Sequence, residues 1–435
     1  MKKISYSQIP LFEHVKKLFP ICRSITGKGT RKTLEYFEKY HPEYKRIKFK
    51  SGKKVFDWEI PLEWNIEDAY IEHIDSGNRY AEFKKSNLHI VGYSIPINKV
   101  IDLKNLYPRL HSLPQQPNVI PYITSYYKPY WGFCLTENEK KDLPFGKYKV
   151  VIRSSLEKGF LDLSHAILKG ETKSEIFISS YVCHPSMANN ELSGPVVLNR
   201  LLDYVKLKYP KRRFTYRFTL LPETIGSIAY MSKYLNDMKK NIICGFNLTC
   251  VGDTRSYSYI QSPYGDTLAD KALKAALINI ENLKVYSFLH KGSDERQFCS
   301  PNADLPLCTF SRSKFLDYPE YHTSADNLDL INEEGLMGSF ETIKNIIDAF
   351  EIGLYPHVLT VGEPQLGKRG LYPLLSEKVQ TNPSQNIVDL IAYCNGRNSL
   401  FEIATLIKVP LKDVCKSCKL LLDNHLIKTY TKPLK

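Results

Sequence analysis

Between residues 155 and 362 the chain alternates between strand-like and helical segments, and this alternation restricts the possible folds more than any other feature. Apolar runs typical of strands, Glu175–Tyr181 and Thr215–Leu221, are each followed by a helical pattern. Strands separated by helical segments predict a mixed or parallel α/β sheet. Since functional residues of such sheets gather at the carboxyl ends of the strands, we expect the site there.

A second pattern occupies residues 46–154. Tyr, Trp, Pro and β-branched residues crowd short segments such as 54–61 and 87–93, and turn residues separate these segments. This pattern predicts a compact β domain. We therefore expect an α/β core made of residues 1–45 and 155–362, into which the β domain is inserted.

The end of the chain has a third pattern. Helical periodicity covers residues 387–394, 400–407 and 411–424, and a strand-like run covers 426–430. Two helices joined by a tight turn and followed by a strand predict a winged helix-turn-helix domain, which we place at residues 371–435.

The charge of the chain is compatible with nucleic-acid binding but does not require it. There are 60 Lys and Arg residues against 46 Asp and Glu, a net charge of +14. The predicted recognition helix carries Lys412, Lys416 and Lys419 but no Arg, Gln or base-reading Asn before its very end. Such a helix can contact phosphates through its lysines, but we do not expect it to recognise a specific nucleic-acid sequence.

Composition also bears on where the protein works. No run of 18 apolar residues occurs, so no membrane-spanning helix is expected. Glu13, His14 and Lys16 interrupt the apolar stretch that a secretory signal needs. Ten cysteines in 435 residues are too sparse and irregular for a disulfide framework. We expect a cytoplasmic protein with reduced thiols and no contact with membranes.

Polar side chains of the kinds that bind zinc follow the predicted strands. The first strand leads into His184, and the second ends at Glu223. Further along the chain come the segments Asp294-Glu295-Arg296 and Tyr321-His322. Imidazole and carboxylate groups bind Zn²⁺ and leave a position for water, and a second carboxylate can take that water's proton. The pattern predicts a zinc hydrolase.

In this order, these segments resemble the zinc-dependent co-catalytic aminopeptidase family of bacterial exopeptidases. They are most similar to an aminopeptidase-like subfamily associated with bacterial polysaccharide-biosynthesis genes, whose members combine a peptidase core, an inserted β domain and a C-terminal winged helix. The resemblance thus implies an α/β fold with a mixed-sheet zinc-exopeptidase core. The segments that carry it are Arg23–Leu34, Phe56–Asn65, Asn87–Ser94, Tyr126–Cys134, His184–Gly194, Pro222–Ser227 and Pro319–Asn327.

The resemblance implies two of the metal ligands, whereas other ligand positions of the family hold different residues in this sequence. His184 matches the first zinc histidine of the family and His322 the last. The position of the metal-bridging aspartate is Asn190, although the adjacent Glu191 offers a carboxylate. The aspartate expected after the third strand is replaced by Thr249. Because most of the carboxylates of a two-metal site are missing, we expect one metal ion.

We therefore predict one Zn²⁺ bound by His184, His322 and Glu191. Asp253, four residues after the changed third-strand position, and Asp294 are alternative sources of the carboxylate.

Glu223 stands where the family has a pair of glutamates, and we predict that it is the general base that deprotonates water. Arg296 and Tyr321 are expected to hold the substrate's carbonyl or a carboxylate, and Asp294 is placed with them in substrate binding.

Two aromatic pairs in the predicted β domain, Tyr126-Tyr127 and Tyr130-Trp131, admit two interpretations. Their side chains could belong to the core of the domain, or they could form a platform for a sugar ring. We expect core packing for both pairs.

Taken together, the sequence predicts an aminopeptidase-like metallohydrolase that removes N-terminal residues from peptides or cleaves a related amide. One alternative is a degenerate, non-peptidase relative that acts on or binds a saccharide-linked amide. Another is a nucleic-acid-binding regulator that uses the winged helix. The expected partner is a peptide or amide substrate, and the winged helix would mediate assembly, including a homo-oligomer, or binding.

Overall fold

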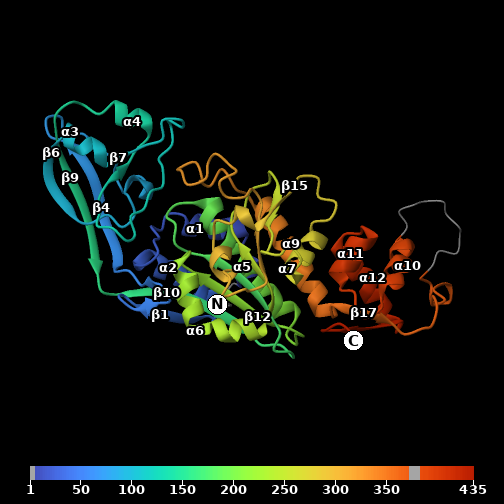
Figure 1. Cartoon of the computed structure of the whole chain (residues 1–435). Coiled ribbons are helices and arrows are strands. Elements are labelled where there is room, and N and C mark those ends of the chain that lie inside the picture. The colour runs from blue at the N-terminus through green and yellow to red at the C-terminus, as the bar shows by residue number, and fades with distance from the viewer. Residues whose placement is uncertain (1–4, 372–382) are drawn as a thin grey trace.

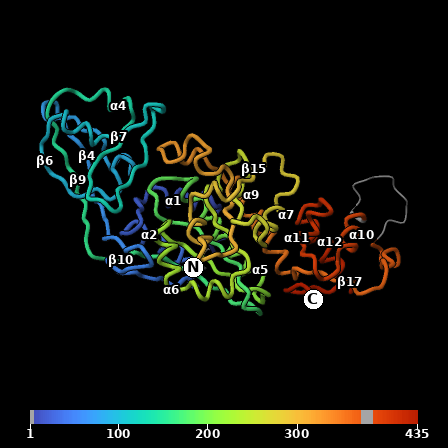
Figure 2. Tube along the Cα trace, viewed as in Figure 1, coloured from blue at the N-terminus to red at the C-terminus, as the bar shows by residue number. Residues whose placement is uncertain are grey.

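The computed structural model describes residues 5–371 and 383–435. Residues 1–4 of the expected core and 372–382 of the expected winged-helix domain lie outside the described residues. The molecule is elongated: a small β unit lies at one end, an α/β core in the middle and a group of C-terminal helices at the other end (Figures 1 and 2).

An eight-stranded mixed sheet forms the core. In spatial order its strands are β1 (Lys45–Lys50), β10 (Phe160–Leu168), β12 (Thr215–Leu221), β11 (Glu175–Tyr181), β13 (Ile242–Leu248), β16 (Leu307–Ser311), β14 (Tyr257–Ile260) and β15 (Leu283–Tyr286). The central pairs β12–β11, β11–β13 and β13–β16 are parallel, and β1 and β10 form an antiparallel edge. The prediction of a mixed sheet is confirmed.

Helices cover both faces of this sheet, because its central strands are apolar on both faces. Ile176 and Ile178 of β11 belong to one buried cluster with residues of five core helices and of the three C-terminal helices. Phe177, which points to the other face as the strand period of two requires, belongs to a second cluster with residues of three helices. The core helices of the first cluster are α1 (Leu11–Leu18), α2 (Lys28–Tyr40), α5 (Ser193–Lys208), α7 (Leu268–Ala276) and α9 (Glu333–Ile352), and the helices of the second are α3 (Leu103–Leu106), α6 (Ile225–Asn241) and α8 (Glu295–Phe298).

The β unit extends from the core on two long strands (Figure 1). Strands β4 (Glu63–His73) and β9 (Lys147–Glu157) pair antiparallel over most of their length and form a four-stranded sheet with β5 (Arg79–Tyr80) and β6 (Ile97–Asp102). Since β1 and β10 both belong to the core sheet, the first core segment extends beyond residue 45. We propose that the insertion lies between these two strands.

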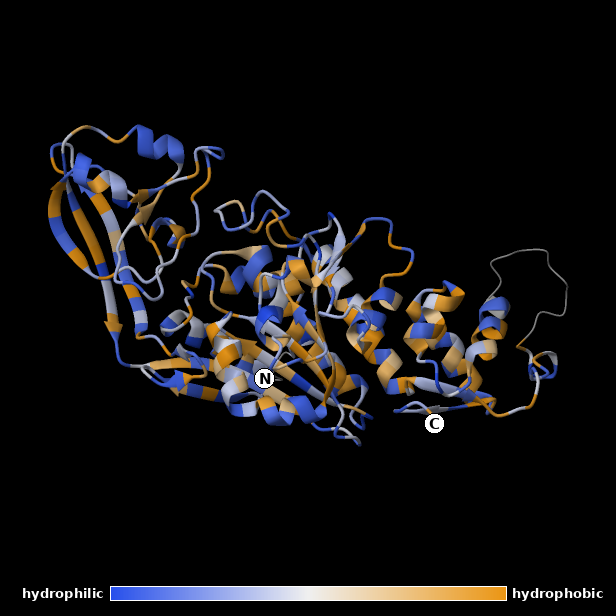
Figure 3. Ribbon diagram, in the orientation of Figure 1, coloured by the Kyte–Doolittle hydropathy of each residue, from blue (hydrophilic) through white to orange (hydrophobic). Residues whose placement is uncertain are grey.

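The C-terminal helices are α10 (Pro383–Tyr393), α11 (Leu400–Ile407) and α12 (Leu411–Asp423), followed by strand β18 (Ile427–Tyr430). Strand β18 pairs antiparallel with β17 (Tyr355–Val358), which precedes residue 371. The helices pack against the core, since the Phe401 and Phe350 rings lie 5.3 Å apart and Lys271 contacts Glu402 at 2.9 Å. In Figure 3 these helices carry orange, apolar residues alternating with blue, polar ones.

The lysines of the predicted recognition helix, α12, lie on its exposed side: Lys412, Lys416 and Lys419 are all accessible to solvent. Lys416 forms an ion pair with Asp413 of the same helix. The absence of sequence-specific nucleic-acid binding stays a prediction. Within the described ranges, no helix is long and apolar enough to cross a membrane.

Candidate active site

The site lies where the neighbouring strands β11 and β12 end. Because these strands are parallel, with Tyr181 paired to Leu221, the residues that follow them leave the sheet at the same edge. The backbone N–H of Glu223 donates to Cys183 Sγ at 3.3 Å, which holds the two loops together. As a result, His184 Nε2 lies 3.7 Å from Glu223 Oε2.

The His184 ring lies between two carboxylates, one at each nitrogen. Its Nδ1 donates to Glu191 Oε2 at 3.0 Å, while Nε2 faces Glu223. Burial favours the neutral ring, but the hydrogen bond to Glu191 and the charges of both carboxylates outweigh it and raise the pKa of His184. Because Nδ1 is engaged by Glu191, Nε2 is the ring nitrogen left on the side of Glu223.

Glu191 is placed behind the histidine by a buried arginine. The Arg23 Nε lies 3.4 Å from Glu191 Oε1, and neither side chain is accessible to solvent. The same Nε donates to the His184 carbonyl oxygen at 2.9 Å, and Nη1 donates to the Leu18 carbonyl oxygen at 2.7 Å. Arg23 thus neutralises the buried carboxylate and fixes it against Nδ1, away from the second histidine.

His322 faces His184, with ring centroids 5.3 Å apart. Its backbone is left-handed (φ 55°), and Tyr321 stacks on the ring at 3.9 Å. Burial and the neighbouring His184 lower the pKa of His322 to about 2, so the ring is neutral. Its Nε2 is buried and has no hydrogen-bond partner among the described residues. A neutral imidazole with a free nitrogen is a suitable metal ligand.

The predicted ligand set is therefore only partly brought together. His184 and His322 meet as expected, but Glu191 lies at the opposite nitrogen of His184, where it cannot share one ion with His322. Among the described residues, potential ligand atoms within 4.8 Å of one another are found in Cys183, His184 and Glu191. Sequence reasoning missed Cys183, although it directly precedes His184. Burial raises the pKa of this thiol well above its ordinary value, which disfavours a thiolate ligand.

The two changed positions form a neutral network on the other side of β11. The Tyr181 hydroxyl donates to Asn190 Oδ1 at 2.7 Å and lies 2.5 Å from Thr249 Oγ1. The Asn190 N–H donates to Asp326 Oδ2 at 3.0 Å, so that carboxylate is engaged by the π-helical turn Ala188–Leu192, which precedes α5. Neutral groups that are already hydrogen-bonded do not suit a second dication. This network therefore offers no unpaired carboxylate for a second metal ion.

Neither alternative carboxylate contacts the histidines. Asp253 accepts hydrogen bonds from Asn189 Nδ2, from the backbone and hydroxyl of Ser313, and from the backbone of Arg255, which is the environment of a structural residue. Asp294 accepts from Thr224 N and Ser227 Oγ, beside Glu223. Burial, and then the charge of Glu223, raise the pKa of Asp294 to about 8.

Glu223 is oriented by a neighbouring hydroxyl. Ser293 Oγ donates to Glu223 Oε1 at 2.7 Å, which leaves Oε2 for the side that faces His184. Burial raises the pKa of Glu223, and the nearby His184 and Ser293 oppose that shift. Arg296, predicted to hold substrate, is exposed and bonds Thr224 Oγ1 at 3.2 Å.

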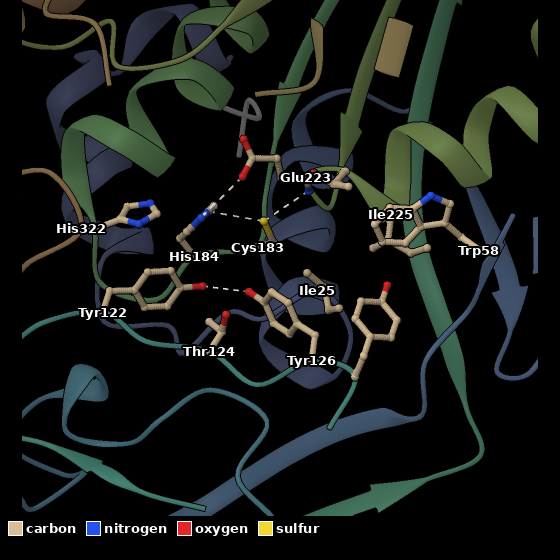
Figure 4. A pocket seen from close by; sticks show the side chains of 12 residues that line it. Ile25, Trp58, Tyr122, Thr124, Tyr126, Cys183, His184, Glu223, Ile225 and His322 are labelled. Atoms are coloured by element: carbon tan, nitrogen blue, oxygen red, sulfur yellow. Dashed lines mark hydrogen bonds and ion pairs between the residues drawn. The ribbon is translucent and has the colours of Figure 1, made fainter. Parts of the chain in front are cut away.

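These side chains open onto a pocket of about 260 Å³ (Figure 4). His184, His322, Glu223 and Cys183 form its polar end, and the predicted substrate-binding residues Arg296, Tyr321 and Asp294 do not line it. The remaining lining is mostly apolar and aromatic: Ile25, Trp58, Tyr122, Thr124, Tyr126, Tyr127, Thr224 and Ile225.

Sequence reasoning missed the aromatic part of this lining. Tyr127, expected in the core of the β domain, is exposed and lines the pocket, whereas Trp131 is buried as expected. Trp58 and Tyr127 lie within two of the segments that carry the family resemblance, Phe56–Asn65 and Tyr126–Cys134. Their position in these two segments was the sequence feature that could have identified them as site residues.

Comparison with known proteins gives two family matches and several relatives. Residues 12–353 match the family described as a domain of unknown function (DUF4910), and residues 354–429 match a winged helix-turn-helix family. A Clostridium acetobutylicum protein with the provisional name of polysaccharide biosynthesis protein with aminopeptidase-like domain is 41% identical over 91% of this chain and 90% of its own length.

Solved structures show the same fold. A crystal structure from Clostridium acetobutylicum, provisionally described as a peptidase, superposes with a TM-score of 0.88 at 38% identity and covers 97% of each chain. A zinc aminopeptidase from Bacillus subtilis superposes with a TM-score of 0.57 at 13% identity, covering 78% of this chain and 93% of that one. These matches confirm the predicted aminopeptidase-like fold and the C-terminal winged helix.

Proposed function

The chain belongs to the family described as a domain of unknown function (DUF4910), and from this membership and its aminopeptidase-like fold we propose that it is a hydrolase that cleaves N-terminal peptide bonds or related amide bonds with zinc-activated water. The observation that carries the proposal is the convergence of two imidazoles and one carboxylate at the end of a pocket. Two imidazoles supply two zinc ligands, and the carboxylate beside them is placed to act as a general base toward water.

We assign the metal to the Nε2 side of His184, with His322 as the second ligand, in place of the predicted set that included Glu191. Three observations support this assignment: His184 Nδ1 is hydrogen-bonded to Glu191, His322 Nε2 is unpartnered among the described residues, and the two rings face each other. When bound, zinc would act as a Lewis acid toward the substrate carbonyl and water.

The chain's own residues would supply the rest of the chemistry. Glu223 Oε2, left free because Ser293 occupies Oε1, accepts the proton of the attacking water and returns it to the leaving amine. Glu191 orients the His184 ring through Nδ1, and buried Arg23 holds Glu191 in place. The apolar lining excludes bulk water from the amide, which strengthens the charge interactions at the polar end.

A second candidate function follows from the neutral network around Asn190 and Thr249. A site that has lost its second metal position could serve a relative that binds or modifies a saccharide-linked amide rather than a peptide. The polysaccharide-biosynthesis name of the Clostridium acetobutylicum relative is consistent with this alternative. Turnover of N-acetylated sugars without turnover of any aminoacyl amide or short peptide would favour it.

Zinc content tests the main proposal. After reconstitution and dialysis, elemental analysis should find about one zinc per chain. His184→Ala and His322→Ala should each lose it, while His290→Ala, an exposed histidine outside the pocket, should retain it. Absence of zinc from the unaltered protein, or full retention in both histidine variants, would refute the assignment.

A further inference from the structure

The outer wall of the pocket consists of two aromatic rings that come from distant parts of the chain. Trp58 lies on the hairpin of β2 (Lys54–Val55) and β3 (Trp58–Glu59), and Tyr127 lies in the loop before β8 (Phe133–Cys134). Their ring centroids are 5.8 Å apart, with the planes inclined by 66°. Figure 4 shows Trp58 on the opposite side of the pocket from His322.

Both rings remain accessible in a chain that buries its other tryptophans. Trp58 is 36% and Tyr127 53% exposed, whereas Trp64 is 3% and Trp131 7% exposed. Leaving a large aromatic face in water forgoes the free energy of its burial, and exposed aromatic groups at a concave site mark binding surfaces. The hairpin also carries Phe56 in a left-handed conformation (φ 53°), which is uncommon for a bulky residue.

The charge and size of the pocket restrict what these rings can contact. Among the described residues that line it, none is Lys or Arg, so a carboxylate or phosphate held away from the histidines would find no cationic side chain. A volume of about 260 Å³ is at the small end of the range for ligand pockets and suits a single ring rather than an extended chain.

We propose that Trp58 and Tyr127 form a ring-binding subsite, which accepts an uncharged ring attached to the amide that is cleaved at the histidines. Aromatic side chains bind such rings through their flat faces, whether the ring is a pyranose with its C–H groups or an aromatic amino-acid side chain. The proposal rests on the proposed function, because that function places the amide next to His184 and His322.

The tryptophan distribution provides a direct binding assay. Because Trp58 is the exposed tryptophan, a ring held against it should change the intrinsic fluorescence of the zinc-loaded Glu223→Gln protein, in which no turnover is expected. The probes are N-acetylglucosamine for a sugar ring, L-phenylalaninamide for an aromatic ring, L-alaninamide as a ringless control and N-acetylglucosamine 6-phosphate as an anionic control. At least one ring probe should saturate the signal, at concentrations about tenfold below either control.

Substitutions test whether the two rings are responsible for binding. Because Trp58 is itself replaced, calorimetry measures the affinity of each variant for the same probes. For the ring probe that binds the unaltered protein, Trp58→Ala and Tyr127→Ala should each lower the affinity about tenfold. Trp58→Phe, which keeps an aromatic ring, should retain most of the affinity. Tyr264→Ala removes an exposed tyrosine outside the pocket (72% exposed) and should change nothing.

The outcomes separate the subsite from the hydrolase. If no ring probe binds, if alaninamide binds as well as both ring probes, or if Trp58→Ala binds rings normally, the subsite is refuted even when the unaltered enzyme hydrolyses amides. If a ring binds through Trp58 but no amide is hydrolysed with any metal, the subsite stands and the proposed hydrolase activity fails.

Discussion

Two neighbouring gaps between strands at the same edge of the sheet have opposite chemical character. On the β12 side of β11, His184 and Glu223 face each other at 3.7 Å. On the β13 side, Tyr181, Asn190 and Thr249 satisfy one another with neutral hydrogen bonds. Reactivity at a strand end therefore depends on which polar atoms remain unpaired, and the fold alone does not decide it.

The largest effect should come from the reactive gap. Glu223→Gln preserves the shape and the hydrogen bond from Ser293 but removes the basic oxygen, so kcat should fall about 10²–10⁴-fold. Elemental analysis should still find zinc. Glu281→Gln, an exposed glutamate outside the pocket, is the control and should retain full activity. Loss of zinc from Glu223→Gln would show that Glu223 is a ligand and that the base lies elsewhere.

A smaller effect is expected behind the histidine. Glu191→Gln should weaken zinc binding about 10–100-fold without abolishing it, because the side chain orients a ligand and is not one itself. A competition titration with a chelator measures this change. Cys183→Ser should bind zinc nearly as tightly as the unaltered protein. If both substitutions abolished binding, the ion would instead lie on the Nδ1 side, with Cys183 and Glu191 as ligands.

Glu351→Gln is a matched control for Glu191→Gln. Glu351 is also a buried glutamate, and it accepts hydrogen bonds from the Arg213 backbone and the Tyr216 hydroxyl, outside the pocket. Its substitution should lower the thermal midpoint without altering the zinc affinity. A comparable loss of affinity in Glu351→Gln would mean that zinc binding responds to general destabilisation.

The smallest effect should come from the neutral gap. Tyr181→Phe removes the hydroxyl that serves Asn190 and Thr249, and should lower the free energy of unfolding by about 1 kcal/mol. Denaturant unfolding measures that loss, and Tyr216→Phe provides a comparison at a buried tyrosine elsewhere. Zinc content should stay at about one per chain. A second tightly bound zinc in Tyr181→Phe would contradict the structural role of this network.

Much of this arrangement could be predicted from sequence, because the relevant patterns are local. The buried runs 175–181 and 215–221 gave strands with those bounds, and the rule for strand ends placed His184 and Glu223 together. The position of Glu191 could not be obtained in this way. It lies in a π-helical turn, Ala188–Leu192, and its direction depends on Arg23, which is remote in sequence.

The aromatic wall was missed for a related reason. Trp58 belongs to a short hairpin strand and Tyr127 to a separate loop, and the composition of each segment is equally typical of a β-domain core. Only the three-dimensional path of the chain brings both rings to the pocket. The first residue of the winged-helix domain was also difficult to predict from sequence. Strand β17 precedes the predicted start at residue 371, and its partner β18 lies at the other end of the domain.

The inserted unit is also bonded directly to the loop that carries His322. The Tyr122 N–H donates to the His322 carbonyl oxygen at 2.9 Å, and Ser324 N–H donates to the Ile120 carbonyl oxygen at 2.8 Å. Movement of residues 120–127 is therefore transmitted to a proposed metal ligand through the backbone. By thermodynamic linkage, any factor by which a bound ring changes the affinity for zinc is the factor by which zinc changes the affinity for the ring. The backbone hydrogen bonds between residues 120–122 and 322–324 would then couple the binding of metal to the binding of substrate.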